Sequence, residues 1–186
     1  MKQQIFPAIK LTGLCIVLFA VIYPAIIWGF AQLFPSKGKG DLIQSGNKTY
    51  YTNIGQSFSQ DKYFWSRPSA VAYNSAGSGG SNKGPSNKEY LKDVEKRLDT
   101  LLMKNPSLKR AEVPVDLITA SGSGLDPDIS LQGAKIQVKR IALARRIRED
   151  QIMDLIASQT EKPLLGLFGP EKINVLKLNL ALDELK

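Results

Sequence analysis

Histidine is absent from this 186-residue sequence, and cysteine occurs once, as Cys15. Without histidine the chain cannot build a Ser-His-Asp triad, a histidine general base or a histidine-ligated metal site. A single cysteine excludes an intrachain disulfide, a CxxC redox pair and a cysteine-rich zinc site. These two scarcities remove the best-known hydrolase, redox and zinc-binding classes.

Acidic residues are missing from the first 40 positions. All 17 Asp and Glu residues lie from Asp41 onward, where they face 21 of the 25 Lys and Arg residues, so residues 41–186 carry +4 of the formal net charge of +8. This mild excess is not typical of a dedicated nucleic-acid binder, and we expect no nucleic-acid partner. With 43% hydrophobic and 23% charged residues, the chain has the composition of a folded protein. Its length leaves room for one domain of ordinary size and an additional segment.

Charge is also missing from residues 11–36, a run of 26 residues between Lys10 and Lys37. A helix of that length spans roughly 39 Å, more than the hydrocarbon layer of about 30 Å. A signal peptide is the alternative, but its apolar core has about 7–15 residues and ends at a small-residue cleavage site. We therefore predict an uncleaved single-pass transmembrane helix within residues 1–36 and a separate domain over residues 37–186.

Four residues inside this helix suggest a contact with another membrane helix. Tyr23 places a hydroxyl near mid-membrane, Pro24 removes a backbone hydrogen bond and predicts a kink, and Ala25 with Gly29 forms a small-xxx-small pair. A generic anchor whose tyrosine bonds its own backbone explains the pattern equally well. The lysines on the two sides are nearly balanced, so charge does not decide the orientation.

Two capping patterns predict helices. Ser86 with Glu89 three residues later forms a capping box, and a leucine-rich stripe then continues to about residue 104. Asp126 before Pro127 predicts an N-cap and a helix through about residue 147. That helix is rich in Lys and Arg, which we interpret as a solvated face, with binding of nucleic acid or anionic lipid as the less common alternative.

Aromatic, β-branched and alternating residues predict the strands. We expect short strands between residues 50 and 65, one over residues 113–119, and one with a single buried face over residues 176–182, where leucine alternates with other residues. A further helix is predicted from residue 149. The domain is thus α+β, anchored by the N-terminal helix.

Gly, Ser and Asn make up 11 of the 14 residues from 74 to 87. The run is either a flexible linker or an ordered functional loop, and composition favours neither. Gly79 and Gly84 have the spacing of a P-loop, but Pro85 stands where the P-loop requires lysine. No nucleotide-binding motif is therefore expected.

Three blocks, at residues 63–87, 113–145 and 174–183, occur in an order that resembles the C subunit family of the bacterial Kdp potassium-transporting P-type ATPase. The resemblance covers nearly the whole chain, and its combination of blocks is highly specific. Asp128 departs from it, because many relatives have histidine there. The matching positions, which the resemblance marks as subunit contacts or structural residues, are Trp65, Arg67, Pro68, Ser69, Tyr73, Asn74, Ser81, Asn82, Pro85, Ser86, Asn87, Ser121, Ser123, Asp126, Gln137, Arg140 and Arg145.

The resemblance implies a non-catalytic subunit of a four-part complex in the bacterial inner membrane. A channel-like subunit conducts potassium, a P-type pump subunit hydrolyses ATP, and a very small single-helix subunit completes the assembly. The family's soluble domain lies outside the cytoplasm near the potassium entrance, with the N-terminus in the cytoplasm. On this basis, we expect an ordered loop at residues 74–87 and a subunit contact at Tyr23 and Pro24.

The family is also described as a catalytic chaperone that raises the ATP affinity of the pump subunit. Direct nucleotide binding has no support in these residues, but an effect by linkage remains possible if this subunit favours one conformation of the pump. Two other functions remain in view. One is an anchored enzyme using Ser121 or Ser123, although no histidine could activate either. The other is a stand-alone, membrane-anchored extracytoplasmic binding module.

Overall fold

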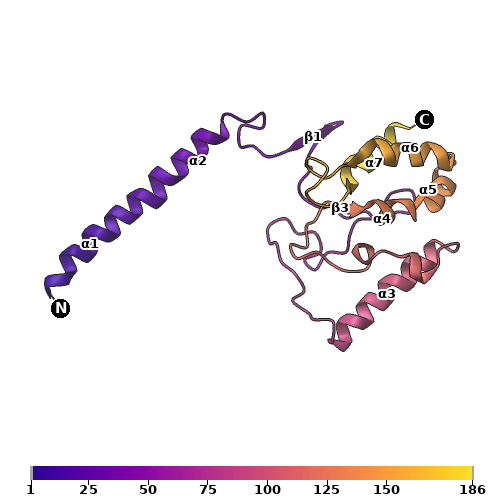
Figure 1. Ribbon diagram of the computed structural model, residues 1–186, viewed down its shortest axis with the longest axis horizontal. Coiled ribbons are helices and arrows are strands. Elements are labelled where there is room, and N and C mark those ends of the chain that lie inside the picture. The colour runs from indigo at the N-terminus through magenta and orange to yellow at the C-terminus, as the bar shows by residue number, and fades with distance from the viewer. Residues whose placement is uncertain (1, 186) are drawn as a thin grey trace. The chain divides into compact units, whose positions relative to one another are not determined.

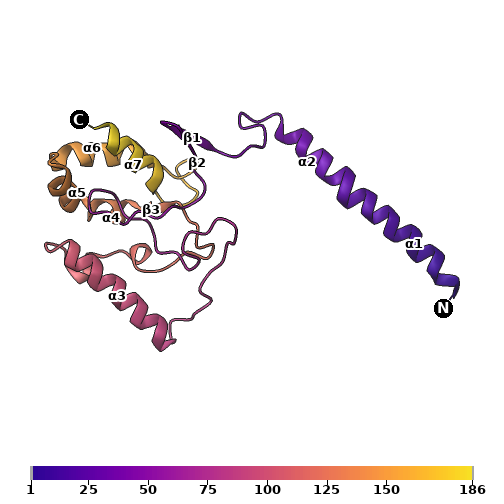
Figure 2. The ribbon, with the colours of Figure 1, turned by 180° about the vertical axis from the view of Figure 1, so that it is seen from behind.

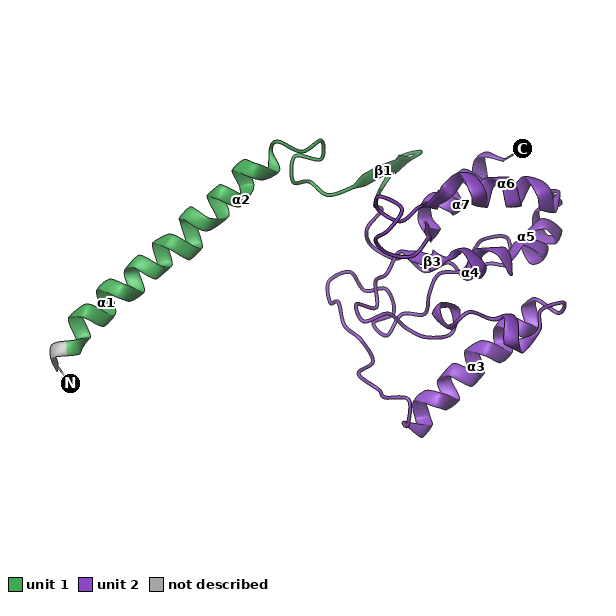
Figure 3. Cartoon of the chain, in the orientation of Figure 1, with its two compact units in different colours: residues 1–51 green, residues 52–186 purple. Residues whose placement is uncertain are grey.

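The computed structural model describes residues 2–185, with side chains from residue 4 onward. Its contacts divide the chain into two compact units, residues 1–51 and residues 52–186 (Figure 3). The first unit contains the apolar helix and a hairpin. The second contains the α+β domain, which agrees with the fold class predicted from the sequence.

The N-terminal segment is one continuous run of helix (Figure 1). It consists of α1 (Lys2–Ile16), a π-helical stretch (Val17–Ile22) and α2 (Tyr23–Ala31). The π-helical stretch ends just before Pro24, which has no N–H to donate and crowds the carbonyl of the preceding turn; a wider turn accommodates both effects. The 28 residues from Gln4 to Ala31 are long and apolar enough to cross a membrane, as predicted.

A β-hairpin follows the helix in the first unit. Strands β1 (Leu42–Ser45) and β2 (Lys48–Tyr51) pair antiparallel, with Ser45 opposite Lys48. The two-residue turn between them uses Gly46, whose φ of +56° suits a residue without Cβ. The prediction of strands throughout residues 50–65 was wrong beyond Tyr51, because residues 52–87 contain neither helix nor strand.

A small antiparallel sheet and four helices form the centre of the second unit (Figures 1 and 2). The strands lie in the order β3 (Asp128–Ser130), β5 (Lys172–Asn174), β4 (Thr160–Glu161). Helix α6 (Glu149–Gln159) packs against α4 (Leu131–Lys135), α5 (Val138–Arg145) and α7 (Val175–Glu184). Fully buried aliphatic side chains fill the space between them: Ile141, Ile152, Ile156, Ile173, Leu178 and Leu182.

The predicted C-terminal strand is instead the helix α7. The side chain of Asn174 caps it by accepting a hydrogen bond from the backbone N–H of Lys177 at 3.1 Å. Alternating leucines also satisfy a helix here, since the buried residues Val175, Leu178, Asn179 and Leu182 recur at spacings of three or four. The strand that does pair, β5, ends at Asn174, two residues before the first leucine, Leu176.

The predicted helix after residue 86 is present as α3 (Lys88–Lys104). Its N-cap is Asn87 rather than Ser86, because the Asn87 side chain accepts a hydrogen bond from the backbone N–H of Tyr90 at 2.9 Å. The predicted strand at residues 113–119 is wrong. Two 3-10 turns, Arg110–Glu112 and Val115–Leu117, occupy the region, and the Thr119 hydroxyl donates back to the Val115 carbonyl at 2.8 Å.

Asp126 does not cap a helix, which corrects the prediction at Asp126-Pro127. The strand β3 follows it, and the helical N-cap is Ser130, whose hydroxyl accepts from the Gly133 N–H at 2.9 Å. The predicted long helix is divided into α4 and α5 at residues 136–137. Most of its cations are exposed, as expected, but Arg140 is buried at 7% exposure.

Candidate functional site: the junction of two polar loops

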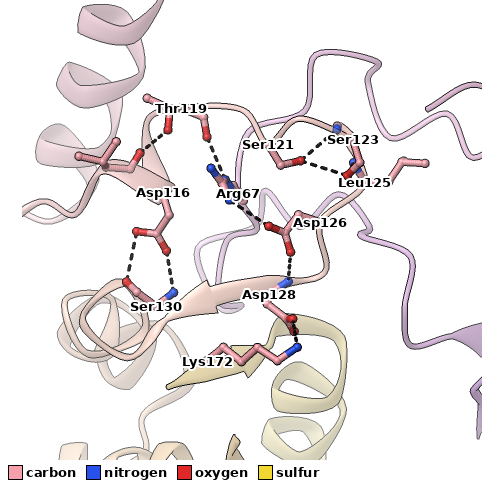
Figure 4. Close-up of polar contacts among 12 residues, drawn as sticks. Arg67, Asp116, Thr119, Ser121, Ser123, Leu125, Asp126, Asp128, Ser130 and Lys172 are labelled. Atoms are coloured by element: carbon pink, nitrogen blue, oxygen red, sulfur yellow. Dashed lines mark hydrogen bonds and ion pairs between the residues drawn. The ribbon is translucent and has the colours of Figure 1, made fainter. Parts of the chain in front are cut away.

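Arg67 connects the two polar loops of the second unit (Figure 4). These are the first polar loop, residues 65–87, and the second polar loop, residues 119–126. The guanidinium donates from Nη1 to the Asp126 carboxylate at 2.9 Å and from Nε to the Thr119 carbonyl at 3.3 Å. Both charged side chains are little more than a quarter exposed, so this charge-assisted pair is partly shielded from water.

The carboxylate of Asp126 extends the network into the sheet. Its second oxygen accepts from the backbone N–H of Asp128 at 3.0 Å, and the Asp128 carboxylate accepts from Lys172 on β5 at 2.6 Å (Figure 4). The Asp128 hydrogen bond raises the pKa of Lys172, which keeps it cationic. Asp128, which stands where the family resemblance expects histidine, therefore fastens β3 to β5 through an ion pair.

Ser69 fixes the shape of the first polar loop. Its hydroxyl donates to the Gly124 carbonyl at 2.6 Å and accepts from the backbone N–H groups of Tyr73 and Val71 at 2.9 and 3.2 Å. The Tyr73 hydroxyl in turn donates to the Arg67 carbonyl at 2.6 Å, and burial raises the pKa of that phenol. The serine and tyrosine thus close the loop on itself and onto its neighbour.

The Gly/Ser/Asn run is attached to the second polar loop. The Gly79 N–H and the Ser78 hydroxyl both donate to the Ser123 carbonyl, at 2.8 and 3.0 Å. Gly124 has a φ of +68°, and a Cβ there would lie 2.7 Å from the Gly79 carbonyl oxygen. Only glycine permits this approach, so the run is an ordered part of the junction.

Ser121 and Ser123 stabilise the turn of the second polar loop. The Ser121 hydroxyl accepts from the Gly124 N–H at 2.9 Å, and the Ser123 hydroxyl accepts from the Leu125 N–H at 3.1 Å. The two hydroxyl oxygens lie 3.3 Å apart. Within residues 2–185, each hydroxyl therefore has a backbone N–H and the other hydroxyl as its hydrogen-bond partners. No general base is among these partners.

Gln137 and Arg140 hold the backbone at the start of the first polar loop and just before it. The Gln137 side chain, fully buried, accepts from the Trp65 N–H at 2.8 Å and from Arg140 at 2.6 Å. Arg140 also donates to the carbonyls of Asp61 and Tyr63 at 2.6 and 3.1 Å, and its guanidinium stacks 4.5 Å from the Trp65 ring. Burial lowers the pKa of Arg140 to about 10, since its partners are chiefly neutral carbonyls.

Arg145 also binds loop backbone, in the segment that precedes the first polar loop. It donates to the Lys62 carbonyl at 2.7 Å and to the Asp183 carboxylate at 2.5 Å, and it stacks 4.9 Å from the Tyr63 ring. The three predicted residues of the α4–α5 region, Gln137, Arg140 and Arg145, are therefore positioning residues. They organise loop backbone rather than face solvent.

The remaining predicted site residues are distributed over the surface. Trp65 and Pro68 line a pocket of about 660 Å³ between the first polar loop and α3, together with Leu101 and Leu117. In the membrane segment, Tyr23 is 58% exposed and a Cβ at Gly29 would meet nothing within 4 Å, so this face, with Pro24 and Ala25, is open. The other predicted residues of the first polar loop are all exposed: Asn74, Ser81, Asn82, Pro85, Ser86 and Asn87.

Three residues that support the junction were not predicted from the sequence. Asp116 accepts from the N–H and hydroxyl of Ser130 at 2.6 and 3.2 Å, and Lys172 binds Asp128. Asn179 is 1% exposed, and its side chain binds the backbone N–H and carbonyl of Phe64. Asn179 did carry a signal, because an amide within a leucine-rich stretch predicts a buried hydrogen-bonding role.

The described residues define a class of protein: a candidate membrane helix followed in the chain by a domain whose polar groups hold its own loops in place. Among them, no cluster of three or more His, Cys, Asp or Glu side chains could hold a metal ion.

Comparisons with known proteins identify the family. The family model described as "K+-transporting ATPase, c chain" matches residues 5–184. Proteins named "Potassium-transporting ATPase KdpC subunit" are 55% identical in Flavobacterium psychrophilum and 54% identical in Flavobacterium johnsoniae, in each case over 99% of this chain and 100% of the relative. One from Bacteroides thetaiotaomicron is 49% identical, again over 99% of this chain and all of the relative.

This chain belongs to the KdpC family. It is an accessory subunit of a potassium transport complex, in which potassium is the transported ion. As a subunit of a transport complex with a candidate membrane helix at Gln4–Ala31, it is a membrane protein. The family resemblance drawn from the sequence is thereby confirmed.

Proposed function

We propose that this chain is the non-catalytic subunit that assembles and stabilises the complex from outside the cytoplasm. In this arrangement residues 1–36 form a short cytoplasmic tail and the membrane helix, and residues 37–186 form the extracytoplasmic domain. Its partners are the channel-like potassium-translocating subunit, the P-type ATPase subunit and the small single-helix subunit. The domain shapes the approach of potassium to the channel-like subunit.

The observation that supports this proposal is the joining of the two polar loops by Arg67 and Asp126. A loop fixed in advance loses little conformational entropy when it meets a partner, so the junction is suited to a stable protein contact. Its hydroxyls and carboxylates are engaged in holding loop backbone. That arrangement favours a contact surface over the anchored-enzyme alternative.

Co-purification tests the assembly role. The tagged full-length chain, expressed with the other subunits and extracted in mild detergent, is expected to elute with two large polytopic subunits. Migration as a lone 20.5 kDa chain would support the stand-alone binding module instead. Arg67→Ala is expected to reduce both co-purification and potassium uptake, whereas Arg146→Ala, at an exposed arginine on the end of α5, serves as the matched control.

A labelling experiment tests the orientation. Lys83→Cys in a Cys15→Ser background places one thiol on an exposed part of the first polar loop. A membrane-impermeant maleimide added to intact spheroplasts is expected to label it fully. Labelling only after lysis would place the domain in the cytoplasm.

The effect on ATP affinity is proposed to be indirect. If the subunit and ATP both bind the same conformation of the pump more tightly, the subunit raises the pump's affinity for ATP, and ATP raises its affinity for the subunit by the same factor. The purified full-length chain alone is expected to show no saturable ATP binding, while the assembled complex binds ATP more tightly than the complex lacking this chain. Micromolar binding by the chain alone would contradict linkage.

A further inference from the structure

The loop between β4 and β5 exposes four large apolar side chains within five residues. Leu164, Leu165, Leu167 and Phe168 are 71%, 81%, 80% and 64% exposed. Residues 163–170, which we call the apolar knob, contain no charge. Single exposed leucines are common, but a cluster this dense on one loop marks an interaction site.

The apolar knob has a fixed backbone. Leu164 and Phe168 exchange hydrogen bonds, N–H to carbonyl in both directions, at 3.1 and 3.0 Å, and the Gly166 N–H donates to the Pro163 carbonyl at 2.9 Å. Leu165 holds a left-handed backbone at φ +55°, which is unfavourable for a leucine. The loop therefore keeps its apolar side chains outward in a strained but closed turn, which indicates that their outward direction serves a purpose.

A protein pocket suits this loop better than a lipid surface. Binding to anionic headgroups calls for a surplus of basic residues, but the knob is flanked by one cation and one anion, Lys162 and Glu171, whose charges cancel. The next cations along the chain are paired: Lys172 lies 2.6 Å from Asp128, and Lys177 lies 3.1 Å from Glu161. The knob also lacks Trp and Tyr, the residues that favour the membrane interface. A rigid, preformed turn gains most from a partner of complementary shape.

We propose that the apolar knob inserts into an apolar pocket on another subunit of the same transport complex. This proposal rests on the proposed assembly function and adds to it the chemistry of one contact. Leucine and phenylalanine side chains supply the burial, while the closed turn presents them without loss of backbone freedom. The occupied pocket belongs to a larger subunit, since the knob needs a concave apolar surface.

Leu165→Asn and Leu167→Asp test the contact in the full-length chain. Asparagine tolerates a left-handed backbone better than leucine, so Leu165→Asn should fold at least as well as the wild type. Each variant is expected to reduce the amount of co-purified partner subunits about ten-fold. Leu143→Asp is the matched control, because Leu143 is a lone leucine on α5 with 82% exposure, and it should leave co-purification unchanged.

The outcomes separate this proposal from the assembly function. If the wild-type chain fails to co-purify, both are wrong. If the wild type and both knob variants co-purify equally, the assembly function stands and the proposal for the knob is overturned. Thermal melting of each variant checks that any loss does not come from unfolding.

A fluorescent label identifies what covers the knob. Leu167→Cys in the Cys15→Ser background carries an environment-sensitive dye, and its emission is measured for the chain alone in detergent, with the partner subunits in detergent, and alone in anionic phospholipid vesicles. A blue shift only with the partner subunits is expected. A blue shift in vesicles without them would assign the knob to the bilayer, and a concentration-dependent shift of the chain alone would assign it to a second copy; either overturns the proposal.

Discussion

Asn179 binds the backbone of Phe64 on both sides across 115 residues of sequence. The Phe64 N–H donates to the Asn179 side-chain oxygen at 2.8 Å, and the side-chain amide donates to the Phe64 carbonyl at 2.9 Å. Phe64 itself is fully buried. The side-chain amide on α7 thus satisfies both backbone groups of Phe64, as a neighbouring strand would in a sheet.

Asn179→Ala is expected to destabilise the domain by about 2–4 kcal/mol, because it leaves a buried N–H and a buried carbonyl without partners. Urea unfolding of the full-length chain in mild detergent, followed by near-UV circular dichroism, measures the loss. Asn53→Ala, at an exposed position, is the control and should change the unfolding free energy by less than about 0.5 kcal/mol. Equal midpoints for the two variants would show that the paired amide does not stabilise the fold.

Arg67→Ala should lower the unfolding free energy by about 1–3 kcal/mol, since the partly buried Asp126 loses its charged partner. Arg67→Lys retains the charge but not the guanidinium geometry that reaches Asp126 and Thr119 together, so we expect it to recover only part of the loss. The same urea titration compares them. Full recovery by lysine would mean that charge alone holds the loops.

Two neighbouring glycines offer a matched pair. Gly124→Ala places a methyl group 2.7 Å from the Gly79 carbonyl oxygen and 2.8 Å from a Val71 methyl, at a left-handed φ, and should cost about 2–4 kcal/mol. Gly122→Ala meets nothing within 4 Å and should be close to neutral. Thermal melting of the two variants side by side distinguishes steric contact from a general intolerance of substitution in this loop.

The buried phenol of Tyr73 should make the stability of the domain depend on pH in the alkaline range. Burial raises the pKa of its phenol above the unfolded value of about 10, so the folded state holds this proton more tightly. The resulting stability is complete below pH 10 and is lost as the pH rises through the folded pKa.

Above pH 10 the wild type should therefore lose stability more steeply than Tyr73→Phe, by up to about 1.4 kcal/mol per pH unit. At pH 7 the variant should be less stable by about 1 kcal/mol, because the Arg67 carbonyl loses its donor. Urea midpoints between pH 7 and 11 measure both effects. Parallel curves would show that the phenol does not titrate differently on folding.

Local sequence patterns predicted the helices well and the strands poorly. The apolar helix and α3 follow from features within each segment, namely an uncharged run and a stripe beside a cap. At residues 176–182 the alternation of leucine allowed both a strand and a helix, and the outcome depended on Asn174, which caps α7. Pairing of a strand needs a partner edge, which local periodicity does not reveal.

The family motif found the residues of the junction, but the local sequence did not reveal the roles of Asp126 and Arg140. Asp126 was predicted as a helix cap, yet it binds Arg67 from a loop 59 positions away. Arg140 lies within a basic run that predicts solvent exposure, but its guanidinium is buried and donates to the Asp61 carbonyl. Both roles arise from contacts between distant segments, and no short window of sequence contains them.

The dependence of residues 52–87 on the C-terminal half has a consequence during synthesis. This stretch leaves the ribosome early, but the side chains that fix its backbone, Gln137, Arg140 and Asn179, follow the residues that they bind by 72, 79 and 115 positions. A nascent or prematurely terminated chain that lacks α7 therefore leaves the backbone of Phe64, next to the first polar loop, without its Asn179 partner. We expect such a chain to hold the joined polar loops less stably than the finished chain does.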